Sequence, residues 1–365
     1  MLRFSKLLLS KLPSQGLAVD HLAPEQCLTR FAANQKSLFK WFGYVDKFIL
    51  FPRRLRTFLR QSLTHGKNPI VHICDHSNAM YSKSAAGFSI SVTTCHDMLA
   101  VLGALGREPD CPASTTGRYL QKWILNGLAS SRHVVCVSNN TRRDLEELLP
   151  SSPRPELHTV YNGLNHSYSP MQPEESQRLM KSAGAKISSP FLLHVGSGQP
   201  RKNRETILKV FAQVRERYPA QMVFAGSPLT DSQSKLATDL KISEFVREVV
   251  SPSNELLNAL YSEALALLFP SRSEGFGWPI IEAQASGCPV VTSNRTSIPE
   301  IVLDTGLTAE PDDVATLTEH CLTLTKLETR NRYRGLGLQN ALRFTTDSMI
   351  EGYIHVYRAA AAQKR

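Results

Sequence analysis

The sequence predicts an α/β protein built from two tandem, doubly wound parallel-sheet domains that face a common cleft. Three observations support this prediction. The chain has 365 residues, which at roughly 100–200 residues per domain corresponds to two domains. Short β-branched segments alternate with helical patterns of about three turns in both halves. The strand segments are nearly continuous in hydrophobicity, as expected where both faces of a Rossmann-like sheet are covered by helices.

The alternation of strands and helices is interrupted once, by a polar stretch that is rich in proline and serine. Before it, we predict strands at 70–74, 89–94, 133–137 and 157–161, with helices at 114–129 and 140–149. After it, we predict strands at 191–195, 222–225, 266–269 and 290–292, with helices at 204–217, 254–264 and 279–286. The expected division is a domain at 1–165, a linker with a short helix at 166–190, a domain at 191–345 and a C-terminal helix at 346–365.

Composition excludes several other classes of protein. Apolar residues make up 42% and charged residues 20%, which argues against a disordered or collagen-like chain. Uncharged apolar runs are far shorter than the roughly 18–20 residues that a spanning helix needs. The seven cysteines form no C-x-x-C pair, which favours separate reduced thiols and a cytoplasmic protein over a disulfide framework.

Positive charge is concentrated in the first half. Residues 1–170 contain 20 Lys and Arg against 11 Asp and Glu, whereas the remainder contains 22 against 21. Four arginines within 39–63 flank a predicted apolar helix side formed by Leu55, Phe58 and Leu59; they are Arg53, Arg54, Arg56 and Arg60. Two interpretations remain open: a solvated helix face, or a basic amphipathic surface that contacts either the headgroups of an anionic membrane or a phosphate-bearing acceptor. No nucleic-acid-binding signature accompanies the charge, so we expect no nucleic-acid partner.

The most informative segment is EGFGWPIIE, from Glu274 to Glu282. It follows the strand predicted at 266–269, and Pro279 occupies the first turn of the next helix. Glycines before a helix allow the backbone amides to approach an anion or polar oxygens. The two carboxylates, eight positions apart, are suited to accept hydrogen bonds from vicinal hydroxyls.

A second segment, FLLHVGSGQPRKN, ends a buried strand in a glycine-containing loop with Arg201 and Lys202. Two cations at the carboxyl end of a strand suit a diphosphate. In the first half, His96-Asp97 ends a predicted strand, and Asp75-His76 ends another. A single histidine in such a position is either a functional group or a structural residue.

The combination of these motifs resembles the retaining glycosyltransferases of family 4, which have the GT-B fold. The likeness covers the chain from about Ile70 to the C-terminal helix and includes the E-x7-E motif, HVGS with RKN, VSNNTRRDL and ASGCPVV. It implies an N-terminal domain on the acceptor side, a C-terminal domain that binds the nucleotide-sugar, and a last helix that crosses back to the N-terminal domain.

The resemblance also implies roles for individual residues. Glu274 contacts hydroxyls of the transferred sugar, His96 reaches that sugar from the N-terminal domain, and Lys202 neutralises the diphosphate; these three form the expected catalytic set. Glu282 binds the ribose hydroxyls. The expected donor-binding residues are Gly196, Ser197, Arg201, Lys202, Gly226, Gly275, Phe276, Gly277 and Glu282.

The implied function is transfer of a hexose from a nucleotide-sugar to a hydroxyl of a glycan or lipid-linked acceptor, with retention of configuration and without a cofactor. We expect no metal, because no D-x-D motif is present and Asp312-Asp313 is typical of a helix start. Two alternatives remain, a GT-B sugar-nucleotide epimerase or hydrolase and a catalytically impaired nucleotide-sugar-binding protein.

The sequence departs from the family pattern at two points. Ser197 stands where many relatives have an arginine, and we expect either that Arg201 compensates or that the phosphate site is weaker. The segment at Met1–Phe4 resembles the helix that normally follows the first strand and its Gly-rich loop. We therefore expect either that the true start lies upstream of Met1 or that part of the acceptor site is absent.

Overall fold

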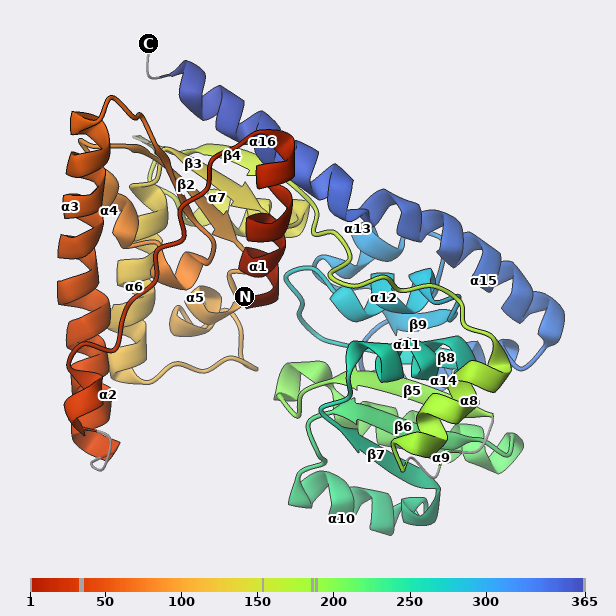
Figure 1. Cartoon of the computed structure of the whole chain (residues 1–365). Helices are drawn as coiled ribbons and strands as arrows, with labels where there is room; N and C mark the ends of the chain where they lie inside the picture. The colour runs from red at the N-terminus through yellow and green to blue at the C-terminus, as the bar shows by residue number, and fades with distance from the viewer. Residues whose placement is uncertain (1, 33–35, 153, 185–186, 188–189, 364–365) are drawn as a thin grey trace.

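The computed structural model describes residues 2–32, 36–152, 154–184, 187 and 190–363. It contains two α/β halves, each with a parallel sheet, lying side by side, and the last two helices, α15 (Leu327–Ala341) and α16 (Thr346–Ala362), run along the C-terminal and the N-terminal half, respectively (Figure 1). This arrangement confirms the predicted fold class.

The sheet of the N-terminal half has the strand order β1-β2-β3-β4, and all of its neighbouring strands are parallel. Each strand lies within a residue or two of its predicted position. The strands are β1 (Ile70–Ile73), β2 (Ile90–Cys95), β3 (His133–Cys136) and β4 (Glu156–Thr159). The helices between them are α4 (Tyr81–Ala85), α5 (Leu99–Ala104), α6 (Thr115–Ala129) and α7 (Asn139–Leu148).

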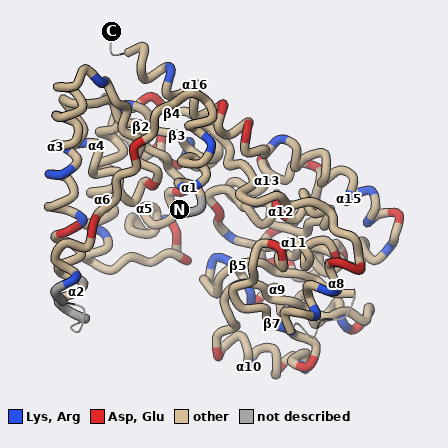
Figure 2. Tube along the Cα trace, in the orientation of Figure 1, with Lys and Arg blue, Asp and Glu red and all other residues tan. Residues whose placement is uncertain are grey.

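The α-helices described before the first strand are α1 (Leu2–Lys11), α2 (Lys36–Val45) and α3 (Phe51–Thr64). Helix α1 begins where the sequence resembled a family helix, and its Phe4 is 1% exposed. Helix α3 buries Leu55 and Leu59 in the core of the N-terminal half, while its arginines face solvent. Leu55 and Leu59 are therefore not available to a bilayer, and contact of the protein with an anionic membrane stays a prediction. The charge along α3 remains exposed (Figure 2).

The sheet of the C-terminal half has the order β10-β9-β8-β5-β6-β7, again entirely parallel. Its strands are β5 (Phe191–Gly196), β6 (Gln221–Gly226), β7 (Val246–Val250), β8 (Ala266–Phe269), β9 (Val290–Ser293) and β10 (Leu307–Ala309). The two edge strands, β7 and β10, were not predicted. Strand β7 carries charged residues and is only partly buried, and β10 has three residues, so neither shows the continuous apolar pattern of a central strand.

Helices cover both faces of this sheet, and the apolar core lies on each side of it. They are α9 (Arg204–Arg217), α10 (Asp231–Asp239), α11 (Asn254–Glu263), α12 (Trp278–Ala285), α13 (Ile298–Val302), α14 (Val314–Thr323) and α15 (Leu327–Ala341). Asp313 caps α14, accepting a hydrogen bond from the Thr316 amide, as expected of a helix start.

Two segments connect the halves. Within the expected linker, α8 (Pro173–Ser182) packs beside α11, where the Ser176 hydroxyl donates to Glu263 at 2.6 Å. At the C-terminus, α16 (Thr346–Ala362) lies on the N-terminal sheet, with Tyr353 hydrogen-bonded to Thr94 at 3.0 Å. None of the helices among the described residues is both long enough and apolar enough to span a bilayer.

Candidate active site

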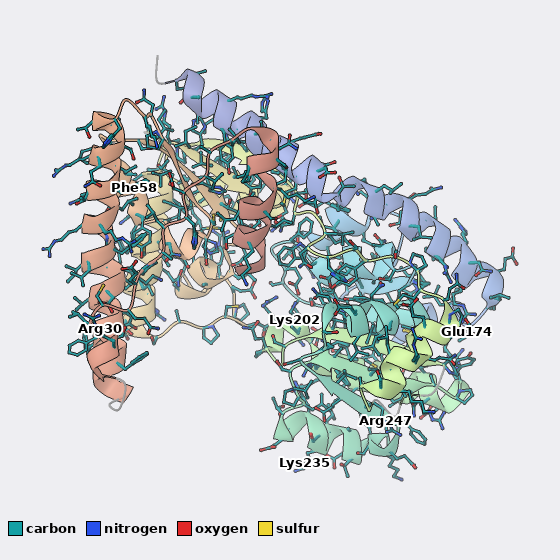
Figure 3. All side chains as sticks on the ribbon, in the orientation of Figure 1. Arg30, Phe58, Glu174, Lys202, Lys235 and Arg247 are labelled. Atoms are coloured by element: carbon teal, nitrogen blue, oxygen red, sulfur yellow. The ribbon has the colours of Figure 1, made fainter. Side chains whose placement is uncertain are left out.

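Three of the ionisable residues predicted for the donor site, Arg201, Lys202 and Glu274, meet at the carboxyl ends of β5 and β8. Lys202 ends a short 3₁₀ turn (Pro200–Lys202) after β5 and lies on the side of the C-terminal half that faces the other half (Figure 3). Its ammonium group donates to Glu274 Oε1 at 2.6 Å, and Arg201 Nη1 lies 3.0 Å from Glu274 Oε2. One buried carboxylate is therefore paired with two cations.

Burial and charge act in opposite directions on this cluster. Burial alone would raise the pKa of Glu274, but the positive charges of Lys202 and Arg201 hold that pKa below its ordinary value. Burial lowers the pKa of Lys202, and Glu274 partly offsets this effect. Glu274 consequently stays ionised near neutral pH, although only 7% of the residue is exposed to solvent.

The glycines at the ends of β5 and β6 leave room for this cluster. Gly196 and Gly226 are partners in the sheet, and a Cβ on Gly226 would lie 2.3 Å from the Gly196 carbonyl oxygen. Gly226 also has φ of 127°, which side-chain-bearing residues rarely adopt. Arg204, which is 2% exposed, donates to the Gly196 carbonyl at 2.8 Å and so fixes the start of the loop that follows β5. Ser197 is half-buried in the same loop.

The glycine loop after β8 touches the N-terminal half directly. A Cβ on Gly275 would lie 2.1 Å from the His96 carbonyl oxygen, so only glycine fits this approach. The Gly275 carbonyl accepts hydrogen bonds from the Ser138 hydroxyl at 2.8 Å and the Thr141 hydroxyl at 3.2 Å. The structure thus brings Glu274 close to the strand end that carries His96, as predicted for a site between two domains.

His96 is held as a neutral imidazole. Its Nε2 lies 2.9 Å from the Cys74 carbonyl oxygen, to which it donates, and Phe4 packs edge-on against its ring at 5.1 Å between centroids. Burial lowers the pKa of His96 to about 4. The tautomer fixed by Cys74 leaves Nδ1 as the acceptor nitrogen.

The remaining predicted residues lie on or just before α12. Gly277 has φ of 98° and precedes the helix. Glu282 is 5% exposed, and its Oε2 accepts a hydrogen bond from the Tyr261 hydroxyl at 3.1 Å. Phe276 is buried, and its ring packs against Phe344 and Tyr161, so the side chain contributes to the core rather than to a ligand surface.

Sequence reasoning missed a residue that connects the two halves through three hydrogen bonds. Glu300 on α13 accepts hydrogen bonds from the amides of Asn139 and Asn140 at 3.0 and 2.8 Å, and from the Tyr161 hydroxyl at 2.9 Å. A carboxylate at the N-terminus of α7 is favoured by the free amides and by the helix dipole. The segment SIPE contains this glutamate, but nothing in its spacing indicates a partner in the other half.

A cavity of ≈ 520 Å³ opens beside Arg201, one of the two cations that pair with Glu274. The N-terminal half contributes Asp110, Cys111 and Gly117 to its wall, and the C-terminal half contributes Gln199 and Arg201. Space for a second substrate is therefore present next to one of the two cations.

Comparison with known families agrees with this geometry. Residues 3–168 match the family model described as Glycosyltransferase Family 4, and residues 175–337 match the model described as Glycosyl transferases group 1. The two models together span both halves, and the chain belongs to glycosyltransferase family 4.

Several named relatives are similar over much of the chain. O-antigen chain mannosyltransferase B of Escherichia coli is 29% identical over 73% of this chain and 70% of the relative. D-inositol 3-phosphate glycosyltransferase of Nocardia farcinica is 28% identical over 74% and 61%, respectively. O-antigen chain mannosyltransferase RfbU of Salmonella typhimurium is 28% identical over 50% and 48%. The chain thus spans less than two thirds of two of these relatives.

Solved structures show the same fold. WaaG, a glycosyltransferase involved in lipopolysaccharide biosynthesis, superposes with a TM-score of 0.69 at 15% identity over 97% of this chain and 95% of that one. Anabaena HepE in complex with UDP and glucose gives a TM-score of 0.70 at 14% identity, covering 93% and 98%. At such identities the similarity establishes the GT-B fold alone.

Proposed function

We propose that this glycosyltransferase moves a hexose from a nucleoside-diphosphate sugar to a hydroxyl of a glycan or lipid-linked acceptor, with retention of configuration. The observation that carries the proposal is the largely buried Lys202–Glu274–Arg201 cluster at the carboxyl end of the C-terminal sheet, next to the loop that contacts the His96 backbone. Open α/β sheets bind ligands at this edge.

The reaction breaks the bond between the sugar and the diphosphate, so negative charge grows on the departing phosphate. Lys202 and Arg201 are already fixed and partly desolvated, and they stabilise this charge more in the transition state than in the ground state. Sugar hydroxyls donate to Glu274, whose low pKa keeps it an acceptor. Nδ1 of neutral His96 accepts from another hydroxyl. The departing phosphate takes the proton of the acceptor hydroxyl.

The relatives support this choice of substrates. Two of them are named as O-antigen chain mannosyltransferases, and HepE was solved with UDP and glucose. The cavity beside Arg201 offers space for an acceptor chain. A lipid-linked acceptor would bring the protein to a membrane surface, where the exposed charge of α3 would be attracted to anionic headgroups.

The test measures sugar transfer and donor hydrolysis separately. The chain is incubated with UDP- and GDP-linked hexoses, with and without a polyprenyl-diphosphate-linked oligosaccharide, and nucleoside diphosphate and glycosylated product are quantified. We expect product that requires the acceptor and has the anomeric configuration of the donor, by NMR. Nucleotide release without an acceptor would favour the hydrolase alternative, whereas binding without turnover would favour the impaired binding protein.

A further inference from the structure

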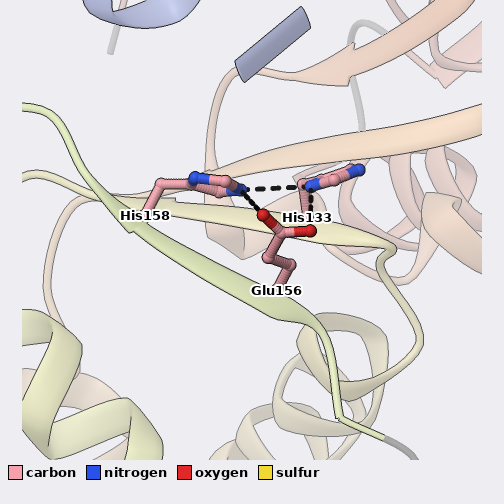
Figure 4. Close-up of side chains that lie close together, drawn as sticks. All are labelled: His133, Glu156 and His158. Carbon is pink, nitrogen blue, oxygen red and sulfur yellow. Dashed lines mark hydrogen bonds and ion pairs between the residues drawn. The ribbon is translucent and has the colours of Figure 1, made fainter. Parts of the chain in front are cut away.

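Three side chains of metal-ligand type meet on the N-terminal sheet, far along the strands from the cleft. His133 begins β3, and Glu156 and His158 lie on the first three residues of β4, so all three are near the amino ends of their strands (Figure 4). His133 and Glu156 are partners in the sheet register. The cleft, by contrast, lies at the carboxyl ends, so this cluster is separate from the donor site.

The ligand atoms of these residues converge. His133 Nδ1 lies 3.1 Å from His158 Nε2, and each imidazole nitrogen lies 3.6 Å from one oxygen of Glu156. Bonds of about 2.0–2.1 Å at tetrahedral angles place neighbouring ligand atoms about 3.3 Å apart. The observed separations are close to that value, so small side-chain adjustments suffice to enclose an ion.

The facing nitrogens of His133 and His158 are hydrogen-bonded to each other, so one of them carries a proton that metal binding would displace. The side chain of His133 is fully buried, while that of Glu156 is 49% exposed, which gives an ion a route from solvent.

We propose that His133, Glu156 and His158 form a binding site for Zn²⁺ or a similar divalent transition metal, with a water molecule as the fourth ligand. Two imidazoles and one carboxylate are a combination that Zn²⁺ accepts. The site is distinct from the donor cleft, where the family resemblance implies no metal.

The site also contacts the end of the helix that joins the two halves. Gln363, directly after α16, donates from its side-chain amide to Glu156 Oε2 at 2.8 Å and accepts from Arg132 Nε at 2.8 Å. A metal that orders Glu156 would therefore hold this end of α16 against the sheet. The role of the metal is structural, and binding is expected to raise the thermal stability of the whole chain.

The test is a titration of the full-length, tag-free chain with Co²⁺ and then with Zn²⁺. Co²⁺ reports geometry by its visible absorption, and Zn²⁺ is measured by competition and by the shift in unfolding temperature. We expect one equivalent to bind, with a tetrahedral spectrum that lacks a thiolate charge-transfer band. The absence of this band distinguishes the site from the free cysteines of the chain.

Variants assign the ligands. Glu156→Gln and His158→Ala should each weaken binding roughly ten-fold or more, the scale of a disturbed metal site. Both positions are partly exposed, so the fold should persist. His65→Ala, at an exposed histidine after α3, is the matched control and should bind as the unmodified chain does. No binding, a thiolate band, or equal affinity in all variants would overturn the proposal.

Discussion

The two edges that face the cleft use ionisable residues in opposite ways. On the C-terminal edge, Glu274, Lys202 and Arg201 are buried but charged, with side chains 8%, 10% and 19% exposed, and each charge is paired. On the N-terminal edge, His96 is half-buried and neutral, with a backbone carbonyl as its partner. Charge stabilisation is therefore expected from the C-terminal half, whereas the N-terminal half orients the sugar through neutral hydrogen bonds.

The largest effect should follow from removing a charge on the C-terminal edge. Lys202→Ala should lower the rate constant for transfer by roughly 10²-fold or more, the scale measured for one lost transition-state donor. Lys209→Ala, at an exposed position on α9, is the control and should leave the rate unchanged. A near-normal rate for Lys202→Ala would assign the phosphate role to Arg201 and weaken the contrast between the two edges.

The second-largest effect should follow from breaking the hydrogen bonds by which Glu300 connects the two halves. Glu300→Ala removes the acceptor of two α7 amides and of the Tyr161 hydroxyl, and hydrogen bonds to a charged group contribute roughly 1.5–3 kcal/mol each. We expect transfer to fall about ten-fold while the affinity for nucleoside diphosphate stays the same, because the donor edge is untouched. Glu310→Ala, at an exposed ion pair with Arg295, is the control. Equal losses in both variants would contradict a role for Glu300 in holding the two halves together.

The neutral histidine predicts a pH effect on stability. The folded-state pKa of His96 is about 4, below its ordinary value of 6.5, so between these values the unfolded chain binds more protons. Stability should fall as pH drops through this window, by up to about 1.36 kcal/mol per pH unit for each such group. Half-buried His72 and fully buried His194, whose pKa values burial also lowers, add to the slope.

Urea unfolding between pH 4 and 7 measures this slope. His96→Asn keeps a donor for the Cys74 carbonyl but removes one titrating group, so its slope should be shallower than that of the unmodified chain. His65→Asn, at an exposed position, should leave the slope unchanged. An unaltered slope for His96→Asn would mean that His96 is not held neutral.

The smallest effect concerns the outer surface of the N-terminal half. Because Leu55 and Leu59 are buried, the attraction of α3 to anionic vesicles should be electrostatic, weak and lost at high salt. Flotation of the chain and of a variant with glutamine at Arg53, Arg54, Arg56 and Arg60 measures it, with neutral vesicles as the control. Binding that persists at high salt would instead require an apolar contact elsewhere.

Much of the fold follows from the sequence, because central strands are buried on both faces and produce continuous apolar segments. The eight predicted strands are all present. The edge strands β7 and β10 were not predicted, because they lack that continuous apolar pattern. The apolar face of α3 was recognisable from its spacing, but not what it packs against, since amphipathic periodicity is the same for a core helix and an interfacial one.

The candidate site shows a similar limit. Strand-end placement brought Glu274, Lys202 and Arg201 together correctly, because the carboxyl ends of neighbouring strands share one edge. It could not reveal that Glu300 caps a helix 160 residues away in the other half. Nor could it reveal that Phe4 packs on His96, since such contacts depend on how the halves and the first helix are placed.

The central claim is that a nucleoside diphosphate binds at the C-terminal edge, and calorimetric titration with UDP and GDP tests it most directly. One of the two should bind the unmodified chain, and Glu282→Ala should weaken that binding roughly ten-fold while leaving the unfolding midpoint in urea nearly unchanged. Tyr261→Phe, which removes only the hydroxyl that donates to Glu282, should have a smaller effect. Unchanged affinity in Glu282→Ala would contradict the assignment of the donor site.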